Sequence, residues 1–401
     1  MPSRRFVLKG AVGAALLLGA RPVLAQLAQA ELTLPFAGGE RRLVTYPQKR
    51  PLIQLTSRPP QLETPFSVFD ESVLTPNDAF FVRYHLANVP LAIDPENFAL
   101  ELTGSVDTPL RLSLAEIRRL PAIEMVAVNQ CSGNSRGFVE PRVGGGQLGH
   151  GAMGNARWRG VALSTLLARA GIRAGAKQVT FNGLDTPVID TVPDFVKALD
   201  IDHANDGEVM LAYAMNGEDL PVLNGFPLRL VVPGYYGTYW TKHVHEIRVI
   251  DSVFDGYWMK TAYRIPDNEC ACVAPGTAPL ATIPINRFTI RSFISNVKEG
   301  DRVVADRDVT VRGFAFDSGH GIANVSLSSD GGRSWSETRL GEDMGRYAFR
   351  HWQANVRLPA GTHELKVRAT GRGGETQPEM PLWNGAGYMR NVIETLRVTA
   401  A

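Results

Sequence analysis

The sequence predicts an α+β protein that is mostly β and is divided into two domains. Towards the C-terminus apolar residues stand at every second position, as in Val309, Val311 and Ala315, which is the period of a β-strand. Turn-forming runs such as Asp330-Gly331-Gly332 separate these patterns, so residues 286–401 are predicted to form a β-sandwich. Residues 31–285 mix strand patterns with short helix signals and are predicted to form the first domain. A chain of 401 residues, 44% of them hydrophobic, is long enough for two such domains.

The charged residues nearly balance, since the chain has 42 Lys and Arg against 40 Asp and Glu. No stretch alternates basic and aromatic residues in the manner of a nucleic-acid-binding groove. The composition therefore argues against a polyanionic partner, and we expect no binding of nucleic acid.

Residues 1–30 are predicted to be an export signal. Arg4 and Arg5 stand in the spacing Ser-Arg-Arg-x-x-Leu-Lys, and an apolar run over residues 10–20 follows. This spacing resembles a twin-arginine signal, which exports bacterial proteins already folded around a cofactor. The alternatives are an ordinary secretory signal or an uncleaved anchor, although the apolar run is short for a membrane span. We therefore expect a periplasmic protein without a membrane span in its mature form.

Residues 31–76 are rich in proline and short apolar segments, and we predict an irregular wrap over the core. The next segment, residues 77–85, has a strand pattern that places Phe81, Arg83 and His85 on one face. Charged and imidazole side chains beside an aromatic one are unusual in a core. Either this face lines a site, or the segment is an edge strand whose polar face meets water.

An apolar β pattern over residues 123–128 leads into a turn of small residues that contains Cys131. The surrounding Ser, Gly and Asn residues allow a tight backbone turn that presents the thiol instead of packing it. Arg136, five residues further on, favours the thiolate and can hold an anion beside it. A thiolate near cationic donors suits a metal that handles oxyanions. The alternative is that Cys131 is a small buried apolar residue, the usual state of a lone cysteine.

Short elements are predicted around this turn. A capping box at residues 113–116 opens one helix, and residues 163–170 form another that ends at a glycine cap. Residues 193–199 are predicted to form a third helix, with proline in its first turn. Residues 177–183 are predicted to form a strand, and the Asn-Gly pair at residues 216–217 predicts a hairpin turn.

Arg229 lies in the apolar strand pattern of residues 226–234, and a buried charge there needs a partner such as phosphate. The aromatic segment that follows leads to Lys242, a second candidate anion contact. His243 and His245 at strand spacing suggest a metal pair, but without further ligands we interpret them as satisfied surface histidines.

Cysteine usage argues against a disulfide-stabilised scaffold, because the chain has only 3 cysteines. Cys270 and Cys272 are separated by one residue, where a mutual disulfide would be strained, so they are predicted to be free thiols. The sequence contains no Cys-x-x-Cys-His motif, and we expect no haem on this chain.

Several longer motifs occur in order along nearly the whole chain. They are Phe-Val-Arg-Tyr-His ending at His85, Asn-Gln-Cys-Ser-Gly-Asn around Cys131, Gly-Asn-Ala-Arg-Trp-Arg-Gly ending at Gly160, Ala-Tyr-Ala-Met-Asn-Gly ending at Gly217, Gly-Phe-Pro-Leu-Arg-Leu-Val-Val-Pro-Gly ending at Gly234 and Ser-Ser-Asp-Gly-Gly-Arg-Ser-Trp ending at Trp335. With these motifs the chain resembles the molybdenum-dependent sulfite oxidases, in the periplasmic bacterial form without a haem domain. The resemblance implies a molybdopterin-binding core domain followed by an immunoglobulin-like domain, through which we expect a homodimer.

The resemblance also implies one molybdenum with molybdopterin per chain, with Cys131 as the thiolate ligand of the metal. Arg83 and Arg136 would line an oxyanion pocket, and Tyr263 occupies the position of the family's active-site tyrosine. Further side chains would contact the pterin or its phosphate, namely Phe81, His85, Asn129, Asp185, Asn224, Arg229, Thr241 and Lys242.

The activity implied is oxidation of sulfite to sulfate, with electrons passed singly to an external acceptor, expected to be a periplasmic c-type cytochrome. One alternative is a molybdenum-dependent reductase of S-oxides such as methionine sulfoxide, and another is a non-catalytic binding protein. Two departures from vertebrate relatives concern the pocket. Asn224 replaces a histidine, and a pocket tryptophan has no evident counterpart around Gly149 and His150.

Overall fold

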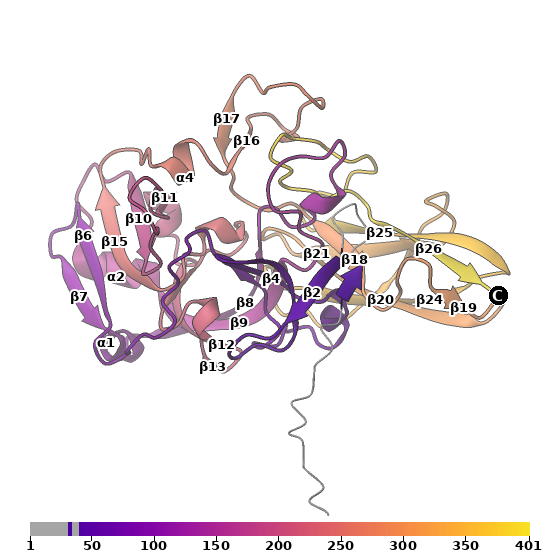
Figure 1. Ribbon diagram of the computed structural model, residues 1–401, viewed down its shortest axis with the longest axis horizontal. Helices are drawn as coiled ribbons and strands as arrows, with labels where there is room; N and C mark the ends of the chain where they lie inside the picture. The colour runs from indigo at the N-terminus through magenta and orange to yellow at the C-terminus, as the bar shows by residue number, and fades with distance from the viewer. Residues whose placement is uncertain (1–30, 34–39) are drawn as a thin grey trace, which may run out of the picture.

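The computed structural model describes residues 31–33 and 40–401 (Figure 1). The export signal predicted over residues 1–30 lies outside this part of the chain. Within it, no helix combines the length and the apolar character that a membrane crossing requires. The fold is mostly β, as predicted, and Figure 1 shows the C-terminal strands β20, β24, β25 and β26 extending away from the remainder of the molecule.

The first sheet is built largely from the segment predicted to be an irregular wrap, so that prediction was wrong. Its strands pair in chain order and are β1 (Glu31–Thr33), β2 (Glu40–Val44), β3 (Leu52–Ser57), β4 (Pro60–Glu63) and β5 (Val82–Arg83). Pro60 opens β4 opposite Ser57, at the end of a hairpin, where the missing N–H of proline is tolerated. The strand predicted over residues 77–85 is reduced to β5, which pairs with β4.

Two sheets form the centre of the N-terminal part. One has the order β11 (Lys197–Asp200), β10 (Gln178–Gly183), β15 (Val244–Ile250), β6 (Ala99–Gly104) and β7 (Leu110–Ser113). The other has the order β13 (Glu218–Asp219), β12 (Met210–Met215), β9 (Met153–Ala162) and β8 (Ala122–Gln130), with β14 (Arg229–Val231) paired to β12. The predicted strand over residues 177–183 and the hairpin at residues 216–217 are confirmed by β10 and by the β12–β13 turn.

The helix predicted over residues 193–199 was wrong, because Lys197 to Asp200 form β11. Val179 of β10 pairs with Leu199, and Lys197, Ala198 and Leu199 are all buried. Pairing with a buried strand therefore outweighs the helix signal given by the proline.

The helices are short and connect the strands. The capping box at Ser113 and Glu116 is present at the start of α1, and α2 has the predicted bounds, with Gly171 as its C-cap. The α-helices and 3-10 helices are η1 (Phe66–Asp70), α1 (Leu114–Arg119), η2 (Arg136–Phe138), α2 (Leu163–Ala170), α3 (Ile201–Ala204), η3 (Val222–Asn224), η4 (Gly237–Tyr239) and α4 (Tyr257–Lys260).

The C-terminal part is a β-sandwich, as predicted. A two-stranded ribbon of β16 (Arg264–Pro266) and β17 (Thr282–Pro284) precedes it. One layer has the order β18 (Arg291–Ile294), β20 (Asp308–Phe316), β24 (Arg350–Arg357) and β23 (Arg339–Leu340). The other has the order β19 (Arg302–Val303), β26 (Thr395–Ala400), β25 (Gly361–Gly371), β21 (Ile322–Ser328) and β22 (Ser336–Glu337). Val311, Val325 and Val367, which are fully buried, belong to a core between the two layers.

An aromatic cluster joins the sandwich to the N-terminal part. Phe69 of η1 lies 5.3 Å from Phe314 and 5.9 Å from Phe349, measured between ring centroids. Phe66 lies 5.5 Å from Phe293 in the same way. Because these rings belong to the main core cluster, the two parts are packed together through apolar contacts as well as joined by the chain.

Candidate active site

Cys131 stands at the end of β8, where the chain turns away from the sheet. Its N–H donates to the carbonyl of Ala152 at 2.9 Å, and its own carbonyl accepts from the N–H of Asn134 at 3.0 Å. Ser135 then adopts a left-handed conformation with φ of 69°, which completes the turn. Cys131 is a free cysteine that is 8% exposed and belongs to the main core cluster, and it also lines a pocket, so it is both packed and presented.

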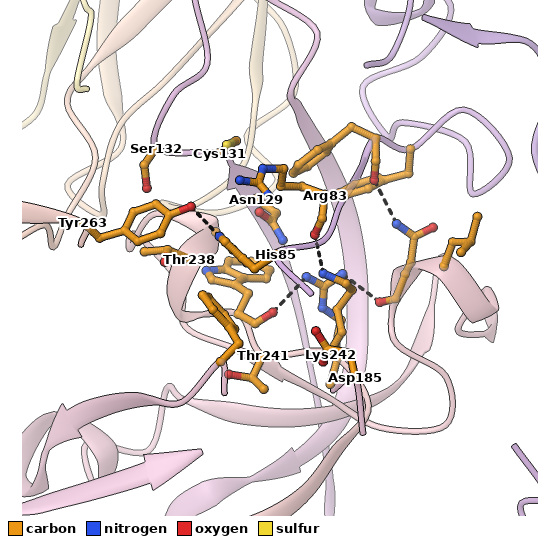
Figure 2. A pocket seen from close by; sticks show the side chains of 18 residues that line it. Arg83, His85, Asn129, Cys131, Ser132, Asp185, Thr238, Thr241, Lys242 and Tyr263 are labelled. Carbon is orange, nitrogen blue, oxygen red and sulfur yellow. Dashed lines mark hydrogen bonds between the residues drawn. The ribbon is translucent and has the colours of Figure 1, made fainter. Parts of the chain in front are cut away.

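The pocket spans about 610 Å³ of space, part of which is open solvent. Segments far apart in the sequence meet here, from β5, the end of β8, β14, η4 and the stretch before β16 (Figure 2). All but one of the site residues proposed from sequence line it: Phe81, Arg83, His85, Asn129, Cys131, Asp185, Asn224, Arg229, Thr241, Lys242 and Tyr263. The exception is Arg136, which lies outside the lining.

Arg229 supplies a deeply buried positive charge at the pocket. It is 4% exposed, and its guanidinium lies 5.0 Å from the Trp158 ring and 5.7 Å from the Trp240 ring. Its Nη1 donates to the carbonyl of Asn224 at 2.9 Å, and it forms no ion pair with any described carboxylate. Burial lowers the pKa of Arg229 to about 9. A guanidinium held in this way is suited to bind an anion that enters the pocket.

Lys242 adds a second cation to the same pocket. Its Nζ donates to the carbonyl of Arg83 at 2.6 Å and lies 4.0 Å from the centre of the Tyr84 ring. Burial lowers the pKa of Lys242, and the nearby charge of Asp185 opposes that shift. Arg83 contributes a third positive charge to the lining, while Asp185 is the one carboxylate there. The described lining therefore has a net positive charge that favours anions.

Several buried polar atoms of the lining have no hydrogen-bond partner among the described residues: Asn129 Oδ1, Ser132 Oγ, Thr238 Oγ1, Thr241 Oγ1 and Arg229 Nε. Leaving one such group unpaired costs about 1–3 kcal/mol. Their common location is explained if the pocket holds a group rich in donors and acceptors. A pterin with a phosphate fits this requirement, and the Cys131 thiolate offers a soft ligand for its metal.

His85 and Tyr263 form a hydrogen-bonded pair across the pocket, between His85 Nε2 and the Tyr263 hydroxyl (Figure 2). The His85 ring stacks on Phe195 with 3.8 Å between centroids. Desolvation lowers the pKa of His85 well below its usual value, and the charge of Arg83 adds to that effect. Burial raises the pKa of Tyr263, so both partners are neutral near pH 7.

Arg136 does not line the pocket, but it contacts a residue that lies next to the lining. Its Nε donates to the carbonyl of Ala386 at 2.8 Å, and its Nη1 donates to the carbonyl of Gly146 at 3.1 Å. Its guanidinium lies 5.0 Å from the ring of Tyr388, which is stacked on Tyr263 with 5.5 Å between centroids. In this geometry Arg136 acts on the pocket through two aromatic rings, and direct contact with a substrate stays a prediction.

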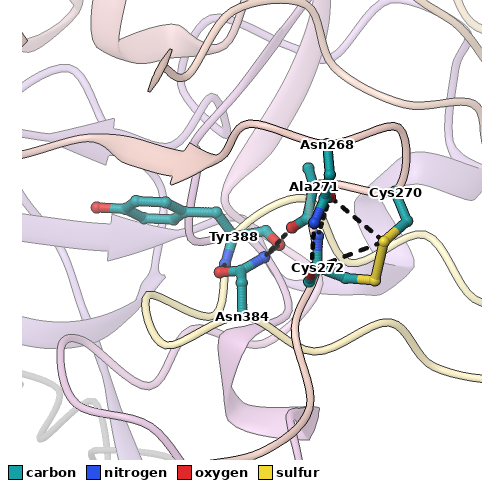
Figure 3. Close-up of a disulfide and its surroundings, with 6 residues drawn as sticks. All are labelled: Asn268, Cys270, Ala271, Cys272, Asn384 and Tyr388. Atoms are coloured by element: carbon teal, nitrogen blue, oxygen red, sulfur yellow. Dashed lines mark hydrogen bonds between the residues drawn. A yellow bond between two sulfur atoms is a disulfide. The ribbon is translucent and has the colours of Figure 1, made fainter. Parts of the chain in front are cut away.

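Tyr388 is connected through Asn384 to a loop that contains a disulfide, which the sequence analysis did not expect. Cys270 and Cys272 are bonded, so the prediction of free thiols was wrong (Figure 3). Ala271 between them has a left-handed φ of 48°, which brings the two Cα atoms to 5.1 Å, within the ordinary disulfide range. The Ala271 carbonyl accepts from Asn384 Nδ2 at 3.3 Å, and the same nitrogen donates to the Tyr388 carbonyl at 2.9 Å.

His243 is buried, so the prediction of a surface position was wrong, although the prediction of a satisfied histidine holds. Its Nδ1 lies 2.6 Å from the Phe226 carbonyl, and its Nε2 lies 2.6 Å from the Tyr84 hydroxyl. Burial lowers the pKa of His243 to about 3, so the neutral ring donates to the carbonyl and accepts from the hydroxyl. His245 remains half-buried on β15.

The sequence analysis missed two buried lysines near the pocket. Lys49 donates to Asn224 Oδ1 at 2.5 Å, while Asn224 Nδ2 donates to the Phe81 carbonyl at 3.1 Å. Both polar atoms of the Asn224 amide are therefore hydrogen-bonded within the protein, which fixes this part of the pocket wall. Lys197 donates to the Trp258 carbonyl at 2.7 Å and lies 5.4 Å from the Tyr263 ring. Further lining residues that were missed are Phe80, Ser132, Phe195, Leu223, Gly237, Thr238 and Trp240.

Two family models match the chain. Residues 85–258 match the oxidoreductase molybdopterin binding domain, and residues 282–400 match the Mo-co oxidoreductase dimerisation domain. The first match includes most of the pocket, among it Cys131, Arg229 and Lys242.

Similar proteins include the sulfite oxidase of Gallus gallus, 34% identical over 383 residues, which covers 90% of this chain and 78% of that protein. The mitochondrial sulfite oxidase of Homo sapiens is 32% identical, with 88% of this chain and 66% of that protein covered. The chain thus spans about two thirds of the human protein. The sulfite oxidase of Arabidopsis thaliana is 29% identical, with 90% and 96% covered. In fold, the chain is similar to the sulfane dehydrogenase SoxCD of Paracoccus pantotrophus, with a TM-score of 0.73, 21% identity and 98% and 93% covered.

Proposed function

Because the chain belongs to the sulfite oxidase family of molybdopterin-dependent oxidoreductases, we propose that it oxidises sulfite to sulfate in the pocket that contains Cys131. The observation that carries the proposal is the convergence of a free thiol, desolvated cations and unpaired polar atoms on one pocket. A single thiolate and an anion-binding wall match what a molybdenum cofactor and an oxyanion substrate require.

Different residues of the pocket would bind different parts of the cofactor. Cys131 would bind the metal, and Arg229 and Lys242 would bind the phosphate of the molybdopterin. The unpaired oxygens of Thr238 and Thr241 would pair with the cofactor's polar groups. When bound, the cofactor supplies oxygen-atom transfer to the substrate and takes up the electron pair that sulfite loses.

Substrate binding is assigned to Arg83. Its Nη1 donates to the neighbouring Tyr84 carbonyl, which leaves its other N–H groups available. These groups would donate to sulfite oxygens, so that the lone pair on sulfur stays free to react. Conversion of sulfite and water to sulfate releases protons. His85 would stay neutral, because burial and the charge of Arg83 lower its pKa, so the released protons would pass to solvent.

Substrate assays separate this function from its competitors. Purified, molybdenum-loaded protein is expected to reduce ferricyanide when sulfite is added, and to show no reduction of methionine sulfoxide with a dye donor. Turnover of the sulfoxide without sulfite oxidation would favour the reductase alternative. A protein that binds molybdenum but turns over neither substrate would contradict the proposal.

We further propose that the protein works in the periplasm as a homodimer and passes electrons singly to a c-type cytochrome. The spacing around Arg4 and Arg5 supports export, and the match to a dimerisation domain over residues 282–400 supports association. Sulfite-dependent reduction of cytochrome c tests the acceptor. Cell fractionation of the wild type and of a variant with both arginines changed to lysine tests the export route, because only the wild type is expected in the periplasm.

A further inference from the structure

A second cluster of possible metal ligands lies in the sandwich, at the end that adjoins the N-terminal part. Asp317 directly follows β20, His320 lies in the turn between β20 and β21, and Glu375 follows β25. One ligand atom from each side chain lies within 4.8 Å of the other two. His320 Nδ1 and Glu375 Oε1 are 3.1 Å apart. None of the three belongs to the pocket around Cys131.

Asp317 has a buried carboxylate oxygen that receives no hydrogen bond from an N–H or hydroxyl group of the described chain. The residue is 2% exposed, and its Oδ1 accepts from the N–H groups of Gly319 at 2.7 Å and Gly321 at 3.0 Å. These contacts fix the carboxylate, while Oδ2 is buried without a hydrogen-bond partner among the described residues. Such an atom requires a ligand or a proton to offset its desolvation.

The unpaired oxygen points towards the other two ligands. A Cβ atom built at Gly371 would lie 3.0 Å from Asp317 Oδ2 and 2.0 Å from Glu375 Oε1. A Cβ atom at Gly373 would lie 2.5 Å from Glu375 Oε2 and 2.8 Å from His320 Nδ1. A side chain at either position would have to displace the Glu375 carboxylate, so the two glycines leave room for the carboxylates and the imidazole to lie close together.

The basic side chains around the cluster are engaged elsewhere. Arg372 is paired with Asp343 at 2.6 Å, and Arg346 is paired with Glu208. Arg287 donates to the carbonyl of Ser318. Two carboxylates thus face each other with an imidazole beside them, and either a shared proton or a cation has to reduce their repulsion.

We propose that Asp317, His320 and Glu375 bind a divalent metal ion of the zinc class, at a site separate from the molybdenum centre. One imidazole nitrogen with two carboxylate oxygens is a donor set that suits zinc, with ligand distances of about 2.0–2.2 Å. Calcium and magnesium prefer oxygen ligands alone, so the imidazole argues against them. The exposed imidazole of His320 can move inwards to close the site, and water can complete the coordination.

The ion would hold together a part of the sandwich that contacts a segment leading to the active site. The Ser318 carbonyl, next to Asp317, accepts from Arg287 Nη1 at 3.2 Å, and the Arg287 guanidinium lies 5.2 Å from the Tyr235 ring. A Cβ atom at Gly234 would lie only 2.2 Å from the Ser318 carbonyl oxygen. The chain from Gly234 runs directly into η4, which carries Thr238 in the pocket lining. The ion's role is therefore structural, and binding should raise the unfolding temperature.

Zinc binding to the molybdenum-loaded, untagged full chain tests the proposal, because loading engages the Cys131 thiol and leaves it unable to compete for zinc. Isothermal titration with zinc chloride should show one saturable site per chain. Asp317→Asn, His320→Ala and Glu375→Gln should each weaken zinc binding at least about tenfold, since loss of supporting groups alone costs that much at metal sites. Zinc should raise the unfolding temperature of the wild type and leave that of His320→Ala unchanged.

His363→Ala is the matched control. His363 is a half-buried histidine on β25 of the same sandwich, with its Nε2 2.7 Å from the Pro359 carbonyl. This variant should bind zinc like the wild type. The proposal is overturned if the wild type takes up no zinc, which would mean that the carboxylates share only a proton. It is also overturned if the ligand variants bind zinc as tightly as the control. Neither readout depends on sulfite turnover, so failure here leaves the proposed activity untouched.

Discussion

Replacement of Arg83 by alanine probes how the substrate is held. Arg83 lies in β5, and its carbonyl accepts from Lys242 Nζ at 2.6 Å, a backbone contact that alanine retains. Arg83 forms no ion pair within the described chain, so its removal leaves no carboxylate unpaired. The expected loss is that of the charge-assisted hydrogen bonds to sulfite, about 1.5–3 kcal/mol. That value corresponds to a fall in kcat/KM of about 10- to 150-fold.

Steady-state kinetics with ferricyanide measures this effect, with molybdenum content determined on the same samples. Arg83→Lys should recover part of the loss, because lysine restores the charge but lacks the planar fork of donors. Arg111→Ala is a suitable control, since Arg111 lies on β7 with a side chain 73% exposed and paired at 3.4 Å with Glu101. An unchanged kcat/KM in Arg83→Ala would refute the assignment. A loss of molybdenum in that variant would instead place Arg83 in cofactor binding.

Two further predictions concern the buried lysines. Lys242→Met should reduce the molybdenum content of purified protein by about tenfold or more, because one charge-assisted contact to the cofactor phosphate is worth about 1.5–3 kcal/mol; metal analysis showing full loading would contradict this role. Burial lowers the pKa of Lys197 from 10.5 to about 7. Between these two pH values the folded chain binds fewer protons than the unfolded chain, so the free energy of unfolding rises with pH. Urea denaturation at about pH 7 and about pH 9 should show a smaller rise in the free energy of unfolding for Lys197→Met than for the wild type. An equal rise in both proteins would show that the pKa of Lys197 is not lowered in the fold.

Local sequence signals predicted the elements that carry the proposed metal ligand and one of the proposed phosphate contacts. The run before Cys131 and the Gly171 cap depend on residues near one another in sequence, and both are found as predicted. The strand that contains Arg229 was predicted for the same reason. A charged residue within an apolar strand pattern can be recognised from the sequence alone, because a buried charge needs a partner.

What the sequence did not reveal depends on contacts between distant segments. Lys49 supports the pocket wall only because the fold brings its Nζ to 2.5 Å from Asn224 Oδ1, and no motif surrounds it. The sequence places Arg136 near Cys131, but the direction of its side chain is set by carbonyls as distant as that of Ala386. The disulfide of Cys270 follows from the backbone conformation of the intervening residue, which spacing alone does not determine.

The central claim is that Cys131 holds a molybdenum centre that oxidises sulfite. The most direct measurement compares the wild type and Cys131→Ser for molybdenum content and for sulfite-dependent reduction of ferricyanide. The wild type should contain one molybdenum per chain and turn over sulfite, whereas the serine variant should lose sulfite turnover because serine lacks the soft thiolate. Undiminished sulfite oxidation by Cys131→Ser would contradict the account.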